Sequence, residues 1–417
     1  MAAIWCISAP LFSHTDWGGF LKTGRELAQR GHHVTWISEN AIGGAVQSAG
    51  LPFVAIRKTG WLWPPPPAPD LSTLKPQEAV MLRYKRALDT WLTVDLVAEG
   101  VQSLLDLAGE VGKPDLILTD PFLTASAIAA EVLHIPLIVC GWPALRDLDE
   151  DFLFPVQKTL GADSQARMQA LYDRFGAQGI NISKGSTPSI LSPHLHLNYF
   201  SPTWYQADLH NLLEQTRFVG GLPDTPADPV PAWLQAIPDE APLGLVTLGT
   251  TFAGELGFFS WAAQAMARAG LIPIVSIGWN PYTADEKAQL KAALPPSTRL
   301  LNWVSFAHVL PRTRVIAHHG GMGTTHWAAV YGVPQVVVPH AADQRGQARR
   351  AAQAKVGLNL TAHEVKNGAL FTGIRALAAD ETVLNNARQL AAEMHALGGA
   401  AAAADAIEAI LRGDTPN

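Results

Sequence analysis

The sequence predicts an α/β protein made of two domains of similar size, each built on a parallel sheet. The chain has 417 residues, a length that by itself suggests about two or three domains. Short apolar runs without polar alternation recur between helical stretches, which is typical of strands covered on both faces of a parallel sheet. A proline-rich segment at 221–242 separates two such alternations and has the composition of a linker.

The first alternation spans residues 1–220 and predicts the N-terminal domain. Strands are expected at 3–8, 34–37, 53–56, 115–119, 137–140 and 196–199, and helices at 20–30, 76–107, 122–133 and over most of 146–185. The stretch 60–76 interrupts this order because it contains Trp61, Trp63 and four consecutive prolines, which cannot join a helix interior or a central strand. It is either a rigid surface loop or an aromatic loop over a binding cleft.

The second alternation spans residues 243–395 and predicts the C-terminal domain. Strands are expected at 243–248, 272–277, 315–317 and 335–338, and helices at 258–269, 284–293 and 324–331. The alanine-rich tail at 376–412 is also helical in pattern. Its end, 396–417, is expected as a C-terminal helix that can pack back on the N-terminal domain.

Composition excludes several classes of protein. With 48% hydrophobic and 16% charged residues the chain is globular, and its net charge of −6 argues against nucleic-acid or acidic-membrane binding. Cys6 and Cys140 each lie in an apolar run, which favours two reduced, buried thiols over a disulfide framework. The N-terminus lacks the basic start of a signal peptide, and the apolar runs are too short to cross a bilayer. We therefore expect a cytoplasmic protein without a transmembrane segment.

The densest group of candidate functional residues is HHGGMGTT at 318–325. It follows an apolar strand and precedes a helix. A glycine-rich turn at a helix N-terminus leaves backbone N–H groups close to a ligand, and the helix dipole favours a diphosphate there. The motif is neither a Walker A loop nor a GxGxxG fingerprint. The alternative is a tight structural turn.

Asp343 and Gln344 form a second candidate site just after a predicted strand. Ligands of open α/β sheets bind at the carboxyl ends of strands. An adjacent carboxylate and amide can hydrogen-bond the vicinal hydroxyls of a sugar. The alternative is that Asp343 caps the following helix.

The run from Trp303 to Gln344 resembles the nucleotide-sugar signature of family 1 glycosyltransferases, the UDP-glycosyltransferase superfamily, and is most similar to the bacterial macrolide-glycosyltransferase type. The matching elements, in order, are Trp303, Leu310, His319-Gly320-Gly321, Gly332-Val333-Pro334 and Asp343-Gln344. A weaker resemblance covers nearly the whole chain. It implies a GT-B fold, in which two Rossmann-like domains with parallel sheets face each other across a cleft, the acceptor lying mainly on the N-terminal domain and the donor on the C-terminal one.

The resemblance also implies a role for each matched residue. Trp303 would stack on the pyrimidine base of the donor beside the Val304 backbone, His319 would contact the diphosphate, and Asp343 and Gln344 would hold the sugar. The full set of implied donor-binding residues is Thr250, Trp303, Val304, His319, Gly321, Gly323, Thr324, Asp343 and Gln344. The sequence departs from the family at Trp327, where many members that use uridine donors place a Glu or Gln on the ribose hydroxyls. Tryptophan cannot accept those hydrogen bonds, so the choice between UDP and dTDP stays open.

The loop at 10–19 is where the resemblance places the catalytic base. His14 is the only histidine in that loop, and a neutral imidazole can take the proton of an attacking hydroxyl. The loop is slightly longer than usual and has Ser13 in place of the common glycine, so Asp16 is the alternative base. Asp120, after a later strand, would orient the histidine, although its ordinary role there would be a helix cap.

The resemblance, together with these residues, implies an inverting, metal-independent glycosyltransferase without a resident cofactor. It would move a hexosyl group from a UDP- or dTDP-sugar to a hydroxyl of a small lipophilic acceptor, such as a natural product. Residues 60–76, 76–107 and 142–185 would line the acceptor pocket. Positive helix ends and His319 would offset the charge of the leaving diphosphate. The alternatives are a nucleotide-sugar epimerase of GT-B fold and a catalytically silent lipid- or nucleotide-sugar-binding module.

Overall fold

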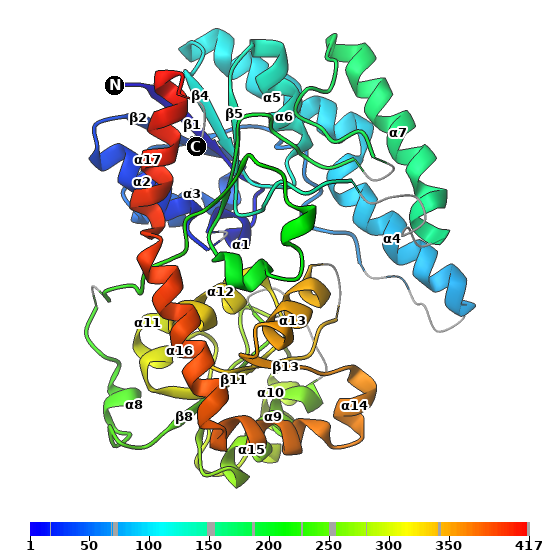
Figure 1. Cartoon of the computed structure of the whole chain (residues 1–417). Helices are drawn as coiled ribbons and strands as arrows, with labels where there is room; N and C mark the ends of the chain where they lie inside the picture. Colours follow the sequence, from blue (N-terminus) through cyan, green and yellow to red (C-terminus); the bar gives the residue numbers. More distant parts are fainter. Residues whose placement is uncertain are drawn as a thin grey trace. The chain divides into compact units, whose positions relative to one another are not determined.

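The computed structural model describes residues 1–16, 18–67, 69, 74–147, 155–185, 188–226, 228–249, 256–280, 282–340 and 343–414. The chain divides into two compact units (Figure 1). Unit 1 comprises Met1–Asn198, Asn211–Val219 and Ala400–Asn417, and unit 2 comprises Tyr199–His210 and Gly220–Gly399. Residues 199–210 and 220–242, which the sequence analysis assigned to the N-terminal domain and to a linker, thus group with unit 2, whereas the C-terminal segment groups with unit 1.

Unit 1 is built on a seven-stranded sheet of order β3-β2-β1-β4-β5-β6-β7, and every pairing is parallel. The strands are β1 Ala3–Ile7, β2 His33–Ser38, β3 Phe53–Ala55, β4 Leu116–Thr119, β5 Leu137–Cys140, β6 Leu195–Asn198 and β7 Thr216–Phe218. Strand order reverses between β1 and β4, where Ile7 is opposite Thr119. The loops after these two strands therefore leave the same edge side by side, at the switch point where open α/β sheets bind ligands.

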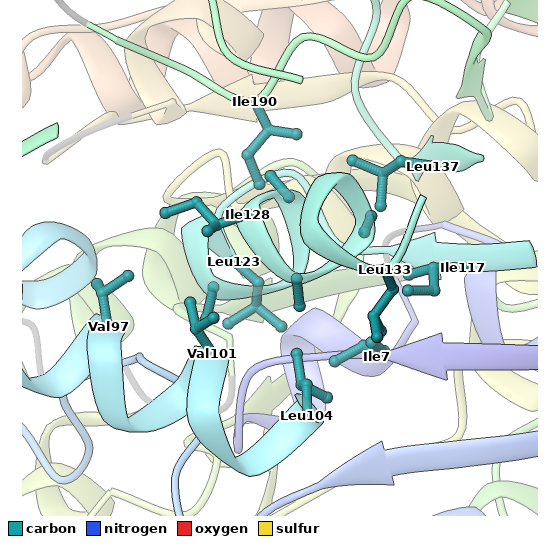
Figure 2. Packing of buried hydrophobic residues seen from close by; sticks show 14 of the residues in the cluster. Ile7, Val97, Val101, Leu104, Ile117, Leu123, Ile128, Leu133, Leu137 and Ile190 are labelled. Carbon is teal, nitrogen blue, oxygen red and sulfur yellow. The ribbon is translucent and has the colours of Figure 1, made fainter. Parts of the chain in front are cut away.

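The helices of unit 1 cover this sheet. They are α1 Phe12–Thr15, α2 Phe20–Gln29, α3 Gly43–Ser48, α4 Pro76–Leu92, α5 Val94–Val111, α6 Thr124–Leu133, α7 Pro155–Phe175 and α17 Gly399–Arg412. Val97, Val101 and Leu104 recur at helical spacing on α5 and give it one apolar face. Figure 2 shows this face packed with Ile128 of α6 and Ile7 of β1 in a single buried cluster. The core thus fixes the strand and helix ends from which the β1 and β4 loops emerge.

Unit 2 is built on a six-stranded parallel sheet of order β10-β9-β8-β11-β12-β13. The strands are β8 Leu243–Thr247, β9 Ile272–Ser276, β10 Arg299–Leu301, β11 Thr313–His318, β12 Gln335–Val337 and β13 Gly357–Asn359. The α-helices are α8 Ala232–Gln235, α9 Leu256–Arg268, α10 Ala284–Ala293, α11 Phe306–Val309, α12 Met322–Val330, α13 Gln344–Gln353, α14 Ala362–Lys366, α15 Ala369–Ala379 and α16 Glu381–Ala396. Two short 3-10 helices are η3 Pro202–Tyr205 and η5 Leu310–Arg312. Here the switch point lies between β8 and β11, so the 318–325 motif leaves the sheet at it.

The predicted class, two α/β units on parallel sheets, is confirmed. Three edge strands, β7, β10 and β13, were missed, and the helix predicted over 76–107 is two helices that meet at Thr93. In the predicted helical stretch 146–185, the described helix is α7. Cys6 and Cys140 are buried thiols, as expected, and burial raises the pKa of the Cys6 thiol.

One helical stretch among the described residues, Glu381–Arg412, is long and apolar enough by composition to cross a membrane. In the structure it is two helices, α16 and α17, separated near Gly398, whose φ is +92°. Leu390 and Met394 of α16 are buried within unit 2, and Ile407 of α17 is buried within unit 1. Part of this stretch is therefore used in packing, and the absence of a transmembrane segment stays a prediction.

Candidate active site

The carboxyl edge of the unit 1 sheet brings His14 and Asp120 together, although 106 residues separate them in sequence. His14 lies in α1, the single turn that follows β1, and Asp120 directly follows β4. His14 Nδ1 is 3.4 Å from Asp120 Oδ2, the imidazole is 10% exposed and the carboxylate is fully buried. The parallel pairing of β1 with β4 is what creates this pair.

The backbone fixes both oxygens of Asp120. Oδ2 accepts a hydrogen bond from the Ala9 N–H at 2.7 Å, and Oδ1 accepts one from the Phe122 N–H at 2.8 Å. The next helix begins only at Thr124, so Asp120 is not its N-cap. A carboxylate held in this way favours the tautomer in which His14 Nδ1 carries the proton and Nε2 carries the lone pair. Pairing with Asp120 favours His14 over Asp16 as the base.

Aromatic side chains surround the imidazole of His14. The Trp61 ring lies 4.8 Å away in an edge-on arrangement, the Phe122 ring lies 5.9 Å away, and Trp142 in turn lies 6.1 Å from Phe122. All three rings are partly exposed. Trp61 belongs to the proline-containing stretch, so this part of it is an aromatic loop against the candidate base. No pattern in the sequence indicates the contact between this stretch and His14.

The turn after β11 in unit 2 is held by His318. Its Nδ1 accepts a hydrogen bond from the Gly320 N–H at 3.0 Å, so its Nε2 donates to Gln335 Oε1 of β12, also at 3.0 Å. Gly320 has a φ of +90°, and a Cβ there would lie 2.8 Å from Val337 Cγ1 and 3.0 Å from the backbone oxygen of Gln344. Glycine is therefore required where this turn packs against the start of α13.

His319 is enclosed by two further glycines. A Cβ on Gly249 would lie 2.8 Å from its Cε1, and one on Gly321 would lie 2.5 Å from its Nε2. Burial, together with smaller effects of the neighbouring His318 and His340, lowers the pKa of His319 to about 3. The imidazole is therefore neutral near pH 7 and has a single N–H with which to donate a hydrogen bond to an anionic oxygen.

The N-terminus of α12 follows directly. Gly321 is its N-cap and offers no side-chain cap, so the backbone N–H groups of the first turn are the donors at this end. Gly323 is exposed, and a Cβ there would meet open space, whereas Thr324 is buried. This arrangement suits an anion at the helix end.

Four more of the predicted donor residues, Trp303, Val304, Asp343 and Gln344, lie at the same carboxyl edge of the unit 2 sheet. Trp303 follows β10 and is 55% exposed, so a ring face is open to stacking, whereas Val304 is buried. Asp343 stands at the N-cap position of α13 but its side chain makes no capping bond, so the predicted alternative role is not observed. Gln344 Oε1 accepts a hydrogen bond from the His340 N–H at 2.9 Å, and Thr250 lies outside the described residues.

Trp327, the departure from the family signature, is buried in the second turn of α12. It is 8% exposed, and its ring lies 5.2 Å from that of His326 and 6.1 Å from that of Tyr331. The indole therefore serves packing within unit 2. Among the described residues, no three His, Cys, Asp or Glu side chains form a group that could hold a metal ion.

Residues 282–410 match a family described as Erythromycin biosynthesis protein CIII-like, C-terminal domain. Over 97% of its length the chain is 25% identical to the NDP-glycosyltransferase YjiC of Bacillus subtilis (strain 168), of which the match covers 96%. It is also 25% identical to the demethyllactenocin mycarosyltransferase of Streptomyces fradiae, over 94% of this chain and 83% of that protein.

Solved glycosyltransferase structures share the fold. The kitacinnamycin glycotransferase matches with a TM-score of 0.74 and 24% identity over 98% of both chains. The spinosyn rhamnosyltransferase SpnG, complexed with thymidine diphosphate, matches with a TM-score of 0.68 and 19% identity, over 97% of this chain and all of that one. The matched C-terminal family, the glycosyltransferase relatives aligned along nearly the whole chain and the shared GT-B fold together support a family 1 bacterial glycosyltransferase.

Proposed function

We propose that this enzyme transfers a hexosyl group, with inversion, from a UDP- or dTDP-sugar to a hydroxyl of a small lipophilic acceptor. The observation that carries the proposal is the pair of His14 and Asp120, 3.4 Å apart and bordered by aromatic rings. The names of two relatives support a nucleotide-sugar donor and a small lipophilic acceptor. One is the TDP-daunosamine transferase DnrS of Streptomyces peucetius, and SpnG has been crystallised with its spinosyn aglycone.

Unit 2 would hold the donor along the carboxyl edge of its sheet. Trp303 would stack on the base, and the Val304 backbone would hydrogen-bond its edge. The start of α12, with Gly321, Gly323 and Thr324, and His319 would bind the diphosphate. Asp343 and Gln344 would accept and donate hydrogen bonds to the sugar hydroxyls. We assign Thr250 to the diphosphate on the family signature alone.

The transfer would occur in one displacement. His14 Nε2 accepts the proton of the acceptor hydroxyl while the hydroxyl oxygen bonds to the anomeric carbon. The bond from that carbon to the diphosphate oxygen breaks, and its electron pair leaves with the nucleoside diphosphate. Asp120 stabilises the imidazolium through Nδ1–H. The helix end and the His319 N–H stabilise the leaving group, so the mechanism requires no metal. An α-linked donor gives a β-linked product.

The acceptor would lie beside the aromatic rings of unit 1. Trp61, Phe122 and Trp142 give the surroundings of His14 an apolar character, which fits a hydrophobic alcohol. Residues 60–76, 76–107 and 142–185 would supply the rest of this pocket. We place the reaction in the cytoplasm, where thiols such as Cys6 and Cys140 stay reduced.

A melting-shift screen with UDP- and dTDP-sugars, followed by mass spectrometry with pooled lipophilic alcohols, tests the proposal. We expect at least one nucleotide sugar to raise the melting temperature and one alcohol to gain a hexosyl group. Epimerised nucleotide sugar formed without any alcohol would instead support an epimerase. Stabilisation by a nucleotide sugar with no product from a broad alcohol panel would support a silent binding module.

We expect nucleotide preference to reflect Trp327; the alternative is that this indole only packs within unit 2 and that another group or a water serves the ribose. This buried indole cannot accept a hydrogen bond from a ribose hydroxyl, and an unpaired buried hydroxyl costs about 1–3 kcal/mol. Because a dTDP-sugar lacks the 2′-hydroxyl, we expect dTDP to bind at least as well as UDP. Competition titration measures this ratio, and a preference for UDP of more than about tenfold would contradict the argument.

A further inference from the structure

The segment Tyr199–His210 is covalently joined to β6 and β7 of unit 1, yet it belongs to unit 2. Its short helix η3 packs against α13. Within η3, Trp204 is buried, and its ring stacks on Phe200 with centroids 5.0 Å apart. The segment therefore presents a fixed indole N–H to the helix whose first residues are proposed to hold the donor sugar.

Gln347 accepts a hydrogen bond from that N–H. Its side chain is fully buried on α13, and Oε1 accepts a hydrogen bond from Trp204 Nε1–H at 2.9 Å. Nε2 donates to Met322 Sδ at 3.5 Å, and the Gln347 backbone N–H donates to the Asp343 carbonyl at 3.1 Å. Met322 is the first residue of α12. The side-chain amide of Gln347 thus links α13, on which it lies, to η3 and to the first turn of α12.

The orientation of this amide follows from its partners. An indole N–H can only donate, so the amide oxygen must face Trp204 and the amide nitrogen must face Met322. Farther along the segment, Asp208 accepts hydrogen bonds from Arg349 at 2.8 Å and from Arg350 at 3.0 Å. The segment is therefore attached to α13 at two places along the helix, which limits how far Trp204 can move.

We propose that Gln347 is a positioning residue that sets the spacing between the start of α12 and the start of α13. The inference rests on the proposed function, in which the first helix end holds the diphosphate and the second holds the sugar. A nucleoside diphosphate contacts only the first of these ends, whereas a nucleotide sugar contacts both. Loss of the Gln347 link should therefore weaken binding of the nucleotide sugar selectively.

The test is calorimetric titration of Gln347→Leu with dTDP and with dTDP-glucose, or with UDP and UDP-glucose if the wild type prefers them. Leucine has a similar size but leaves the Trp204 N–H unpaired. We expect the affinity for the nucleotide sugar to fall about 5- to 50-fold, while that for the diphosphate changes less than about twofold. KM for the nucleotide sugar should rise accordingly. Trp204→Phe keeps the ring stack. It should lower the affinity for the nucleotide sugar by a smaller factor and again leave the affinity for the diphosphate nearly unchanged.

Gln353→Leu is the matched control, because Gln353 is exposed at the last residue of the same helix. It should leave both affinities unchanged. Equal losses for the two ligands in Gln347→Leu, or no loss for either, would overturn the proposal. If Gln347→Leu does not fold, the same comparison of affinities for the nucleotide sugar and the diphosphate is made with Trp204→Phe, and the same outcomes support or overturn the proposal.

Amide hydrogen exchange, measured on the protein without ligand, distinguishes a failure of this inference from a failure of the proposed function. If the wild type bound no nucleotide sugar, the proposed function would fail. The spacing role would then be judged by amide exchange at the starts of α12 and α13. Faster exchange there in Gln347→Leu, with an unchanged melting temperature, supports the link between the helices, and unchanged exchange overturns it.

Discussion

Two histidines occupy comparable places in the two units and have different surroundings. Each follows a strand at the switch point of its own sheet, His14 after β1 and His319 after β11. His14 faces a buried carboxylate held by two backbone N–H groups. His319 lies between glycines and beside other histidines, and its pKa is lowered to about 3. The neighbours therefore suit His14 to accept a proton and His319 to donate one hydrogen bond while remaining neutral.

Replacing His14 tests the first half of this comparison. His14→Ala should lower kcat by roughly 10²–10⁴-fold, the usual contribution of a general base, with nucleoside diphosphate affinity unchanged. Turnover and calorimetric titration on the same preparation measure both quantities. His33→Ala, at an exposed histidine of the same unit, is the control. Full turnover in His14→Ala would exclude it as the base and direct attention to Asp16.

Replacing Asp120 tests whether the two residues act as a unit. Asp120→Asn should lower kcat by about 10²–10⁴-fold, because the amide no longer favours the tautomer with the proton on Nδ1. Residues that act together are strongly non-additive. The double variant His14→Ala with Asp120→Asn should therefore be little slower than the slower single variant. Multiplied losses would show that the two side chains act independently.

The pH dependence of stability tests the neutral state of the unit 2 histidines. Burial lowers the pKa of His318 to about 4 and that of His319 to about 3, against 6.5 in the unfolded chain. Below pH 6.5 the unfolded state therefore binds protons that the folded state does not, and the free energy of unfolding falls as pH decreases towards 4. Each histidine accounts for up to roughly 3 kcal/mol of this fall in the free energy of unfolding.

Urea denaturation at pH 8, 6.5 and 5 measures that dependence. The His318→Asn and His319→Asn variants should each lose less stability than the wild type as pH falls. If the free energy of unfolding depended on pH in both variants as it does in the wild type, these imidazoles would not resist protonation in the folded state. That result would contradict the contrast drawn between His319 and His14.

Replacing His319 tests the second half of the comparison. His319→Ala should weaken nucleoside diphosphate binding by about 10- to 150-fold, the worth of a hydrogen bond to a charged oxygen, and nucleoside binding much less. His363→Ala, at an exposed histidine of unit 2, is the control. Equal losses for the diphosphate and the nucleoside would make His319 a structural residue.

Much of the fold was predictable because the central strands are uninterrupted apolar runs. The edge strands β7, β10 and β13 have the sequences TRF, RLL and GLN, which contain polar residues or glycine, so no apolar run marks them and they were missed. The break between α4 and α5 at Thr93 was missed because neither glycine nor proline marks it.

The site was predictable where a motif or a strand end carried the signal. The family signature and the two strand ends led to His14, Asp120 and His319. The contact of Trp61 with His14 and the bond of Trp204 to Gln347 join segments far apart in sequence, the second pair by 143 residues. No local pattern encodes such contacts, because they depend on how the packed elements meet.

The central claim is a single displacement that joins the sugar to a lipophilic alcohol. Its most direct test is to incubate the wild type with α-linked dTDP-glucose or UDP-glucose and an aromatic alcohol, and to determine the anomeric configuration of the product by NMR together with the amount of nucleoside diphosphate released. We expect a β-glucoside and one nucleoside diphosphate per product. An α-glucoside, or epimerised nucleotide sugar formed without the alcohol, would contradict it.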